Sequence, residues 1–301
     1  MNTLIKHIRK KYQLYIMILP ALTIILLFNY LPMYGLQLAF RDFDMSKGLT
    51  GGTFVGLKYF TKFIQGNQFV TLIKNTSLIS FFTLLAGFPT PIILALLFNQ
   101  IRNSTQRKTV QTIAYVPHFI SMIVLVGMLL VFLSPTSGIA GNVFRVLGKD
   151  PINIMGEAKL FRLVYVISEI WQHSGWNSII YIAALSSIDP QLYEAAKVDG
   201  ASRFRRILHI DIPGLLPTII ILLILNAGGI MSVGFEKIFL MQNSLNLSVS
   251  EVISTYTYKI GIINNQISYS SAIGLFNTLI NFIFLVTVNQ ISKRTNNTSL
   301  W

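Results

Sequence analysis

The sequence contains no cysteine and few charged residues. The absence of cysteine from all 301 residues excludes disulfides, thiolate nucleophiles and cysteine-based metal sites. Asp, Glu, Lys and Arg together make up only 12% of the chain, whereas about 25% is typical of soluble domains. Hydrophobic residues make up 52%. This balance excludes an ordinary soluble domain and predicts a chain that lies in a lipid bilayer.

Motifs for binding ATP or a metal ion are also missing. A phosphate-binding loop requires a lysine after its second glycine, but Leu57 follows Gly56 in the stretch with suitable glycine spacing. We therefore expect no enzyme activity and no cofactor in this chain. The histidines have no metal-ligand spacing either; they are His7, His118, His173 and His209.

Long stretches without charge mark the candidate membrane spans, because a charge at the bilayer centre costs about 2.5 to 3.5 kcal/mol. Several such stretches reach the roughly 20 residues that a helical span requires. A further stretch, Leu163 to Ile188, contains Glu169 as its single charge. The sequence thus predicts six spans, at residues 14–37, 76–98, 110–133, 162–186, 214–233 and 271–291.

The excess of basic residues predicts how these spans are oriented. Lys plus Arg number 24 against 11 Asp plus Glu, which gives a formal net charge of +13. On a soluble protein this excess would indicate nucleic-acid binding. Here the cation density is about twofold higher in the loops on the side of both termini, which favours a cytoplasmic location for that side. We therefore expect a multi-pass protein of the cell membrane with both termini in the cytoplasm and no nucleic-acid partner.

The first apolar stretch could instead be a cleaved secretory signal, since a basic leader precedes it. It is longer than the roughly 7 to 15 apolar residues of a signal, and no clean cleavage site follows it. We therefore expect an uncleaved anchor span. The predicted organisation is a basic cytoplasmic N-terminus at 1–13, the anchor span at 14–37, an extracytoplasmic loop at 38–75, a transmembrane domain with five spans at 76–291 and a cytoplasmic tail at 292–301.

The predicted cytoplasmic loop at 187–213 is long enough to fold by itself. Asp189 is a suitable N-cap, Pro190 fits a first helical turn, and Gly200 can adopt the left-handed conformation that ends a helix. We expect one short helix over 191–199 and a second over 201–208. The alternative is an ordinary amphipathic loop helix without a specific partner. The residues at fixed spacing in this loop are Glu194, Ala195, Ala196, Gly200, Ile210 and Pro213.

This spacing resembles the signature of the permease subunits of binding-protein-dependent ABC importers. That signature reads Glu-Ala-Ala, three residues, Gly, nine residues, Ile, any residue, Leu, Pro, and this chain departs from it with Ile212 in place of Leu. The departure conserves volume. The resemblance implies a type I importer permease fold, with a coupling helix that docks on an ATPase subunit where ATP and Mg bind. It also implies a second permease subunit, two ATPase subunits and an extracytoplasmic substrate-binding lipoprotein as partners.

Other segments are similar to the carbohydrate branch of these permeases, and to its subgroup that imports oligosaccharide or polysaccharide fragments. Relatives often carry Gly-Gly-Pro after the fifth span, whereas this chain has Gln242–Asn246 there, which agrees with that subgroup. The resemblance thus implies a carbohydrate cargo. The segments that carry it are Leu31–Gly35, Ala39–Asp42, Pro117–Ser121, Tyr193–Ala201, Phe235–Phe239 and Ala272–Phe276.

Polar residues inside the predicted spans are candidates for a substrate path, because such residues are costly in lipid. Helical spacing puts Glu169, His173 and Trp176 on one face of the fourth span, with Trp171 off that face. The alternative is that Glu169 lies near the outer surface and the tryptophans form an interfacial belt. The path candidates are Glu169, Trp171, His173, Trp176, Asn177, Asn226, Asn277 and Asn281.

Two other functions stay open at this point: an ion-coupled secondary transporter, and an ABC permease for a solute other than a sugar. The predicted outer loops, to which we assign Lys237, carry more cations than acids, which slightly favours an anionic glycan. Exposed charges are screened beyond about 8 Å in physiological salt, so this excess does not decide the cargo.

Overall fold

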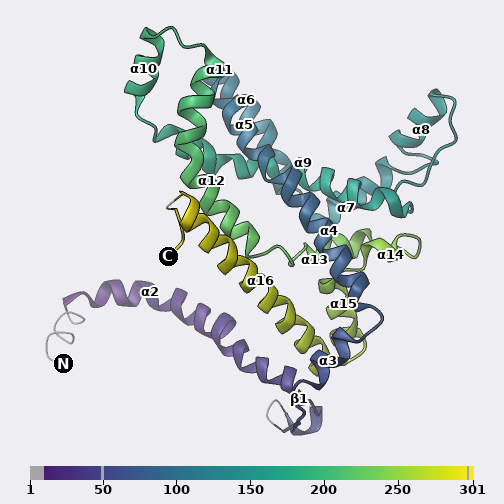
Figure 1. Cartoon of the computed structure of the whole chain (residues 1–301). Coiled ribbons are helices and arrows are strands. Elements are labelled where there is room, and N and C mark those ends of the chain that lie inside the picture. Colours follow the sequence, from purple (N-terminus) through teal and green to yellow (C-terminus); the bar gives the residue numbers. More distant parts are fainter. Residues whose placement is uncertain (1–9, 49–50, 297) are drawn as a thin grey trace. The chain divides into compact units, whose positions relative to one another are not determined.

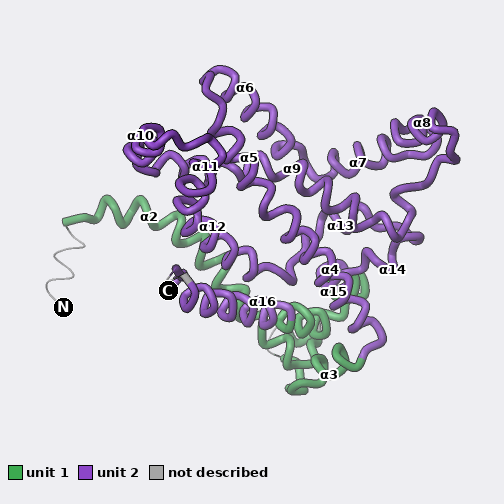
Figure 2. Tube along the Cα trace, turned by 45° about the horizontal axis from the view of Figure 1, so that its top comes forward, with its two compact units in different colours: residues 1–65, 257–276 green, residues 66–256, 277–301 purple. Residues whose placement is uncertain are grey.

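The computed structural model describes residues 10–48, 51–296 and 298–301, and the regular structure of these residues is mainly helical (Figure 1). Their one sheet is an antiparallel pair of two-residue strands, β1 (Arg41–Asp42) and β2 (Thr53–Phe54). Most of the predicted basic N-terminus lies outside the described residues. The chain divides into two compact units, residues 1–65 with 257–276 and residues 66–256 with 277–301 (Figure 2). The predicted all-α fold is confirmed for the described residues.

Unit 1 begins with a helix that is exposed along most of its length. It runs from Tyr12 to Phe40, and none of the residues in its most apolar window is buried. The predicted anchor span at 14–37 is therefore confirmed as a helix long and apolar enough to cross a membrane. The helical elements of unit 1 are α2 (Tyr12–Ile25), the π-helix η1 (Leu26–Tyr30), the 3-10 helices η2 (Leu31–Phe40) and η3 (Met45–Lys47), α3 (Lys58–Ile64) and the π-helix η6 (Lys259–Ile263).

The two sequence segments of unit 1 are joined by polar contacts around its small ribbon. The Tyr59 hydroxyl donates a hydrogen bond of 2.6 Å to Asp42, and the Lys58 ammonium lies 3.4 Å from the same carboxylate. The hydrogen bond from Tyr59 lowers the pKa of Asp42, while burial and the same bond raise the pKa of Tyr59 to about 12. The backbone N–H of Phe43 donates to Ser268 Oγ at 2.9 Å, which ties the ribbon to the second segment.

Unit 2 is built around the long helix α9 (Ala158–Ser186), which contacts α4, α5, α6, η4, α12 and α14. A Cβ placed on Gly175 would lie 1.9 Å from the carbonyl oxygen of Ala114, so a glycine is required where α6 crosses α9. Two helices, α15 (Ile253–Tyr258) and α16 (Ile267–Asn296), pass from one unit to the other. The other elements of unit 2 are α4 (Phe69–Gly87), α5 (Pro89–Asn99), α6 (Ser104–Tyr115), η4 (Val116–Phe119), α7 (Met122–Phe132), α8 (Ile139–Val146), α10 (Pro190–Val198), α11 (Arg203–Arg206), η5 (Ile207–Asp211), α12 (Ile212–Ala227), α13 (Phe235–Met241) and α14 (Leu247–Ser250).

Two buried apolar clusters lie at different positions along α9. One gathers Phe161 and Tyr165 of α9 with residues of α4, α7 and α13, among them Ile79, Val126 and Ile238. The other joins the C-terminal part of α9, at Tyr181 and Leu185, to Ala95 of α5 and Leu215 of α12. Between these clusters α9 carries its polar run, so the interior of unit 2 is polar at mid-helix and apolar on both sides of it.

The described residues contain four helices that are long and apolar enough to cross a membrane, or five if one bent pair counts as a span. The predicted spans at 14–37, 76–98, 214–233 and 271–291 each fall on one of these four. Helix α9 covers the predicted span at 162–186 with 29 residues but is not among the candidates, and its membrane crossing stays a prediction. The four candidates are Tyr12–Phe40, Phe69–Asn99, Arg203–Ala227 and Ile267–Thr295.

The predicted span at 110–133 is not one continuous helix. Helices α6 with η4 and α7 are bent by 97° relative to each other at a short break. Ile120 is extended there, and the Ser121 side chain caps α7 by accepting from the Val124 N–H at 3.4 Å. The carbonyl of Ile120, which has no helical partner, accepts a hydrogen bond of 2.9 Å from Gln172 of α9. The predicted span is therefore broken at Ile120, where Gln172 satisfies the backbone carbonyl that the break exposes, and its membrane crossing stays a prediction.

The predicted fifth span also differs at both ends. The helix begins at Arg203 and runs through the π-helical turn η5 and Pro213 without a break, so Pro213 does not start a new helix. Pro213 lies in the first turn of α12, directly after η5. It has no backbone N–H that would need an acceptor, and the wider π-helical turn before it leaves room for its ring. At its other end the helix stops at Ala227 rather than at residue 233, because Gly228 and Gly229 follow.

Candidate functional site

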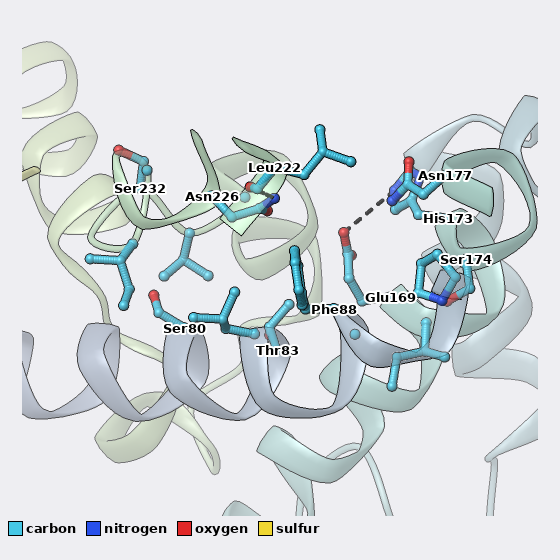
Figure 3. A pocket seen from close by; sticks show the side chains of 18 of the residues that line it. Ser80, Thr83, Phe88, Glu169, His173, Ser174, Asn177, Leu222, Asn226 and Ser232 are labelled. Atoms are coloured by element: carbon cyan, nitrogen blue, oxygen red, sulfur yellow. Dashed lines mark hydrogen bonds and ion pairs between the residues drawn. The ribbon is translucent and has the colours of Figure 1, made fainter. Parts of the chain in front are cut away.

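A cavity of about 420 Å³ lies within unit 2 at the polar middle of α9. Helices α4, α5, α9 and α12 and the segment from Gly229 to Gly234 line it. Figure 3 shows Ser80, Thr83 and Phe88 on one side, Asn226 and Leu222 on another, and Glu169 between them and His173. Of the predicted path residues, the structure brings four to this cavity: Glu169, His173, Asn177 and Asn226.

Glu169 is paired with a lysine that the sequence analysis assigned to an outer loop. Lys237 of α13 is only 1% exposed, and its ammonium lies 2.7 Å from Glu169 Oε2. The ammonium also donates to the Tyr165 carbonyl at 3.2 Å and lies 4.7 Å from the centre of the Tyr165 ring. The assignment of Lys237 to an exposed loop was wrong, because α13 folds back against α7 and α9 instead of leaving the helical body.

Two histidines extend this ion pair into a polar chain. Glu169 Oε1 lies 3.4 Å from His173 Nε2, and His173 Nδ1 lies 3.1 Å from His118 Nδ1. With both rings neutral, both contacts are hydrogen bonds only if His118 donates to His173 and His173 donates to Glu169. His118 and His173 are 55 positions apart in the sequence, and they meet because η4 packs against α9.

The other predicted path residues do not line the cavity. Trp176 stacks on His118 with parallel rings 4.7 Å apart, and Trp171 is 48% exposed. Asn281 accepts from the Met231 N–H and donates to Ser232 Oγ, both at 2.8 Å. The side-chain oxygen of Asn277 is buried without a hydrogen-bond partner. Asn281 thus supports Ser232, which lines the cavity, while Trp176 contacts His118 next to the lining residue His173.

The motif loop has the local structure that its sequence predicts. Helix α10 begins after Asp189, whose carboxylate accepts from the Gln191 N–H at 2.9 Å. It ends in a Schellman motif: the Ala201 N–H bonds the Ala196 carbonyl at 2.8 Å, and the Gly200 N–H bonds that of Lys197 at 3.1 Å. Gly200 has φ +69°, so the predicted left-handed terminus is confirmed. The second helix, by contrast, begins at Arg203 and not at Ala201, because Ser202 is its N-cap.

A hydrogen bond ties α10 to the spans. The Tyr193 hydroxyl donates to Asp211 Oδ1 at 2.5 Å, and Gln100, which follows α5, donates to Asp211 Oδ2 at 3.5 Å. Asp211 is fully buried. Burial, together with the hydrogen bond to Asp211, raises the pKa of Tyr193, so its phenol remains a donor at neutral pH. These hydrogen bonds connect α10 to the ends of both α5 and α12.

The rest of α10 is open to a partner. None of its residues is buried, and Leu192 and Val198 are 52% and 88% exposed. Beside it lies a hollow of about 340 Å³, lined by Arg205, Arg206 and His209 together with Ala196 and Ile210 of the motif. A solvent-facing helix with apolar side chains and small alanines offers a surface for close contact with another protein.

Sequence reasoning missed several residues that line the cavity and the lysine that supports its wall. Lys237 was counted as a loop cation because the apolar stretch that ends at Phe235 was taken as the end of a span. Tyr165 and the hydroxyls Ser80, Thr83 and Ser232 carry no signal in a span, since single hydroxyl residues are tolerated in membrane helices. Among the described residues, no group of three or more His, Asp or Glu could hold a metal ion.

Apolar spans, a polar cavity between them and an exposed helix beyond their end define a membrane transport subunit. The chain matches the family of binding-protein-dependent transport system inner membrane components over residues 87–297, and it belongs to that family. It is therefore a permease subunit, a non-enzymatic membrane component without a cofactor of its own. An ion-coupled transporter that works alone is thereby set aside.

The more particular likeness is to permeases for polysaccharide fragments. The chain is 40% identical to the polygalacturonan/rhamnogalacturonan transport system permease protein YteP of Bacillus subtilis (strain 168), over 97% of this chain and 90% of that protein. It is also 40% identical to Protein LplB of the same organism, over 93% and 88% of the two chains. A crystal structure of a bacterial ABC transporter involved in the import of the acidic polysaccharide alginate contains a chain that is 39% identical, with a TM-score of 0.89 and coverage of 98% of this chain and 99% of that one. The type I importer permease fold implied by the motif is confirmed by this likeness.

Proposed function

We propose that this chain is the permease subunit through which an ABC importer takes up oligosaccharide fragments of an acidic polysaccharide. The observation that carries the proposal is the likeness over nearly the whole chain to YteP, named for polygalacturonan and rhamnogalacturonan transport, and to a transporter of the acidic polysaccharide alginate. The cavity supports it chemically, since hydroxyl, amide and carboxylate groups from α4, α9, α12 and the segment from Gly229 to Gly234 converge there and can bond sugar hydroxyls.

The importer would contain a second permease, two copies of an ATPase subunit and an extracytoplasmic binding lipoprotein, with both termini of this chain in the cytoplasm. A second solved structure similar to this chain is that of an alginate ABC transporter in complex with a periplasmic protein bound to an alginate pentasaccharide. Closure of the ATPases would move α10, and the contact of Tyr193 with Asp211 would carry that movement into α5 and α12. The coupling residues would be Glu194, Ala195, Ala196, Gly200, Ile210 and Pro213.

Four residues that line the cavity, Glu169, His173, Asn177 and Asn226, would form the path. The other four candidates do not line the cavity, and we propose no direct contact with the sugar for them: Trp171, Trp176, Asn277 and Asn281. Their contacts or exposure give them other tasks, such as the support that Asn281 gives to Met231 and Ser232.

The test is uptake by the complete importer reconstituted in proteoliposomes with ATP inside. We expect ATP-dependent accumulation of oligogalacturonate or oligoalginate fragments, and little accumulation of a neutral maltooligosaccharide of the same length. The binding protein and the ATPase must both be required. Equal uptake without ATP, or uptake of the neutral glycan alone, would contradict the proposal.

A further inference from the structure

The cavity wall contains one carboxylate whose charge faces the proposed path of an anionic sugar. Among the described residues that line the cavity, Glu169 is the only acid, and none is a lysine or arginine. An unpaired carboxylate in this position would repel each uronate that passes, because electrostatic repulsion is strong where the surroundings are poorly polarisable. The carboxylates of the proposed cargo would therefore be repelled by Glu169 unless a nearby positive charge neutralises it.

Lys237 provides that balance from behind the wall. It does not line the cavity, is 1% exposed, and places its ammonium 2.7 Å from Glu169 Oε2. The Tyr165 carbonyl and ring hold the ammonium from the other side. The lysine is thus fixed in the protein interior and is not itself available to a sugar.

The remaining groups around the pair add no charge while the histidines are neutral. His173 contacts the other carboxylate oxygen at 3.4 Å, and His118 contacts His173. Tyr165 is the other titratable group that touches the pair, and its phenol is neutral at physiological pH. The Glu169 carboxylate can consequently still accept hydrogen bonds from a sugar. The pair of Glu169 and Lys237, taken together, has no net charge.

We propose that Lys237 is a specificity-determining residue: by neutralising Glu169 it allows the cavity to admit a sugar that carries carboxylates. The inference rests on the proposed acidic cargo. It differs from a purely structural role for the ion pair, which would affect neutral and anionic sugars alike.

The experiment uses the full importer in proteoliposomes and a pair of substrates of equal length, an acidic oligouronate and its methyl-esterified form. Both must first be shown to bind the isolated binding protein, and both are supplied at saturating concentration. The variants are Lys237→Met, Glu169→Gln and the double substitution, with Lys149→Met as the control because Lys149 is an exposed lysine away from the cavity. Assembly of each importer is checked by size-exclusion chromatography.

We expect Lys237→Met to lower uptake of the acidic substrate by about tenfold or more relative to the ester, because Glu169 is then unpaired. The double variant, whose wall is again uncharged, should recover most of the lost acidic uptake. Lys149→Met should leave the ratio of the two substrates unchanged.

An equal loss of both substrates in Lys237→Met, with no recovery in the double variant, would overturn the inference and leave the pair a structural contact. If Lys237→Met alone fails to assemble, the comparison of Glu169→Gln with the double variant decides. In Glu169→Gln, Lys237 has lost its carboxylate partner, so the ratio of acidic to esterified uptake should be higher than in the double variant. An equal ratio in the two variants would overturn the inference. Failure of the unmodified importer to take up either uronate substrate would instead contradict the proposed function.

Discussion

At the scale of single residues, the polar groups on the long helices of unit 2 fall into two kinds. Glu169, His173 and Asn226 border the cavity and are available to a solute. Asn75 and Asn281 are buried, and their amides bond backbone and side-chain groups of neighbouring segments. The sequence does not distinguish the two kinds. A polar residue in an apolar stretch is unfavourable in lipid whether its side chain bonds a neighbouring helix or lines a cavity.

Asn281 offers a test of the second kind. Asn281→Ala leaves the buried N–H of Met231 without an acceptor, which costs about 1 to 3 kcal/mol. We expect a lower midpoint of thermal unfolding for the detergent-solubilised importer. Size-exclusion chromatography of samples heated to increasing temperatures measures this midpoint.

The matched control is Asn226→Ala. Its side chain is exposed and donates only to the Leu222 carbonyl of its own helix, so its loss should shift the midpoint far less. Equal shifts for the two variants would contradict the support role of Asn281.

At the scale of elements, helix α10 is positioned by its two ends and by one side chain. Asp189 and Gly200 set where it begins and stops, and Tyr193 ties it to the buried Asp211. Its outer face carries Glu194 and remains exposed. The helix is therefore firmly attached to the spans and free on the side where an ATPase would bind.

Substitutions in α10 should uncouple ATP hydrolysis from transport. We expect Glu194→Ala and Gly200→Val to abolish sugar uptake and its stimulation of ATPase activity, because the first removes a directed charge and the second forces a β-branched residue into φ +69°. Tyr193→Phe keeps the ring and removes the bond to Asp211, so it should lower the amount of sugar taken up per ATP while basal hydrolysis persists.

Ratios of uptake to hydrolysis in proteoliposomes measure these effects, and membrane insertion is checked by immunoblotting. Tyr12→Phe is a suitable control, since Tyr12 lies on the exposed first helix of unit 1. Normal coupling in both the Glu194 and the Gly200 variants would refute the role of α10.

At the scale of the whole molecule, the net charge of +13 and the apolar composition together describe a membrane topology. Several long helices expose apolar side chains over most of their length, as expected for surfaces that face lipid or other subunits. Ionisable groups buried inside unit 2 have polar partners, as Glu169 has in Lys237 and Asp211 in Tyr193.

The absence of cysteine makes this topology directly testable, because any introduced thiol is the only one in the chain. We expect Lys149→Cys to react with a membrane-impermeant maleimide in intact cells, and Arg107→Cys to react only after the membrane is opened. The unmodified chain must stay unlabelled. Labelling of Arg107→Cys in intact cells would place that loop outside and refute the predicted orientation.

The sequence by itself determined the class of this protein. Long charge-free stretches predict membrane helices whatever their packing, since lipid excludes charge, and the spacing from Glu194 to Pro213 is local enough to be read along one loop. The caps at Asp189 and Gly200 were predictable for the same reason, because they depend on residues a few positions apart.

Only the tertiary structure decided which polar residues meet at the cavity. Lys237 reaches Glu169 from a helix 68 positions away, and His118 reaches His173 over 55 positions because η4 packs against α9. Such contacts depend on where the chain turns and on which backbone groups neighbouring helices satisfy. These are properties of packing between distant segments, and they arise only once the helices have come together.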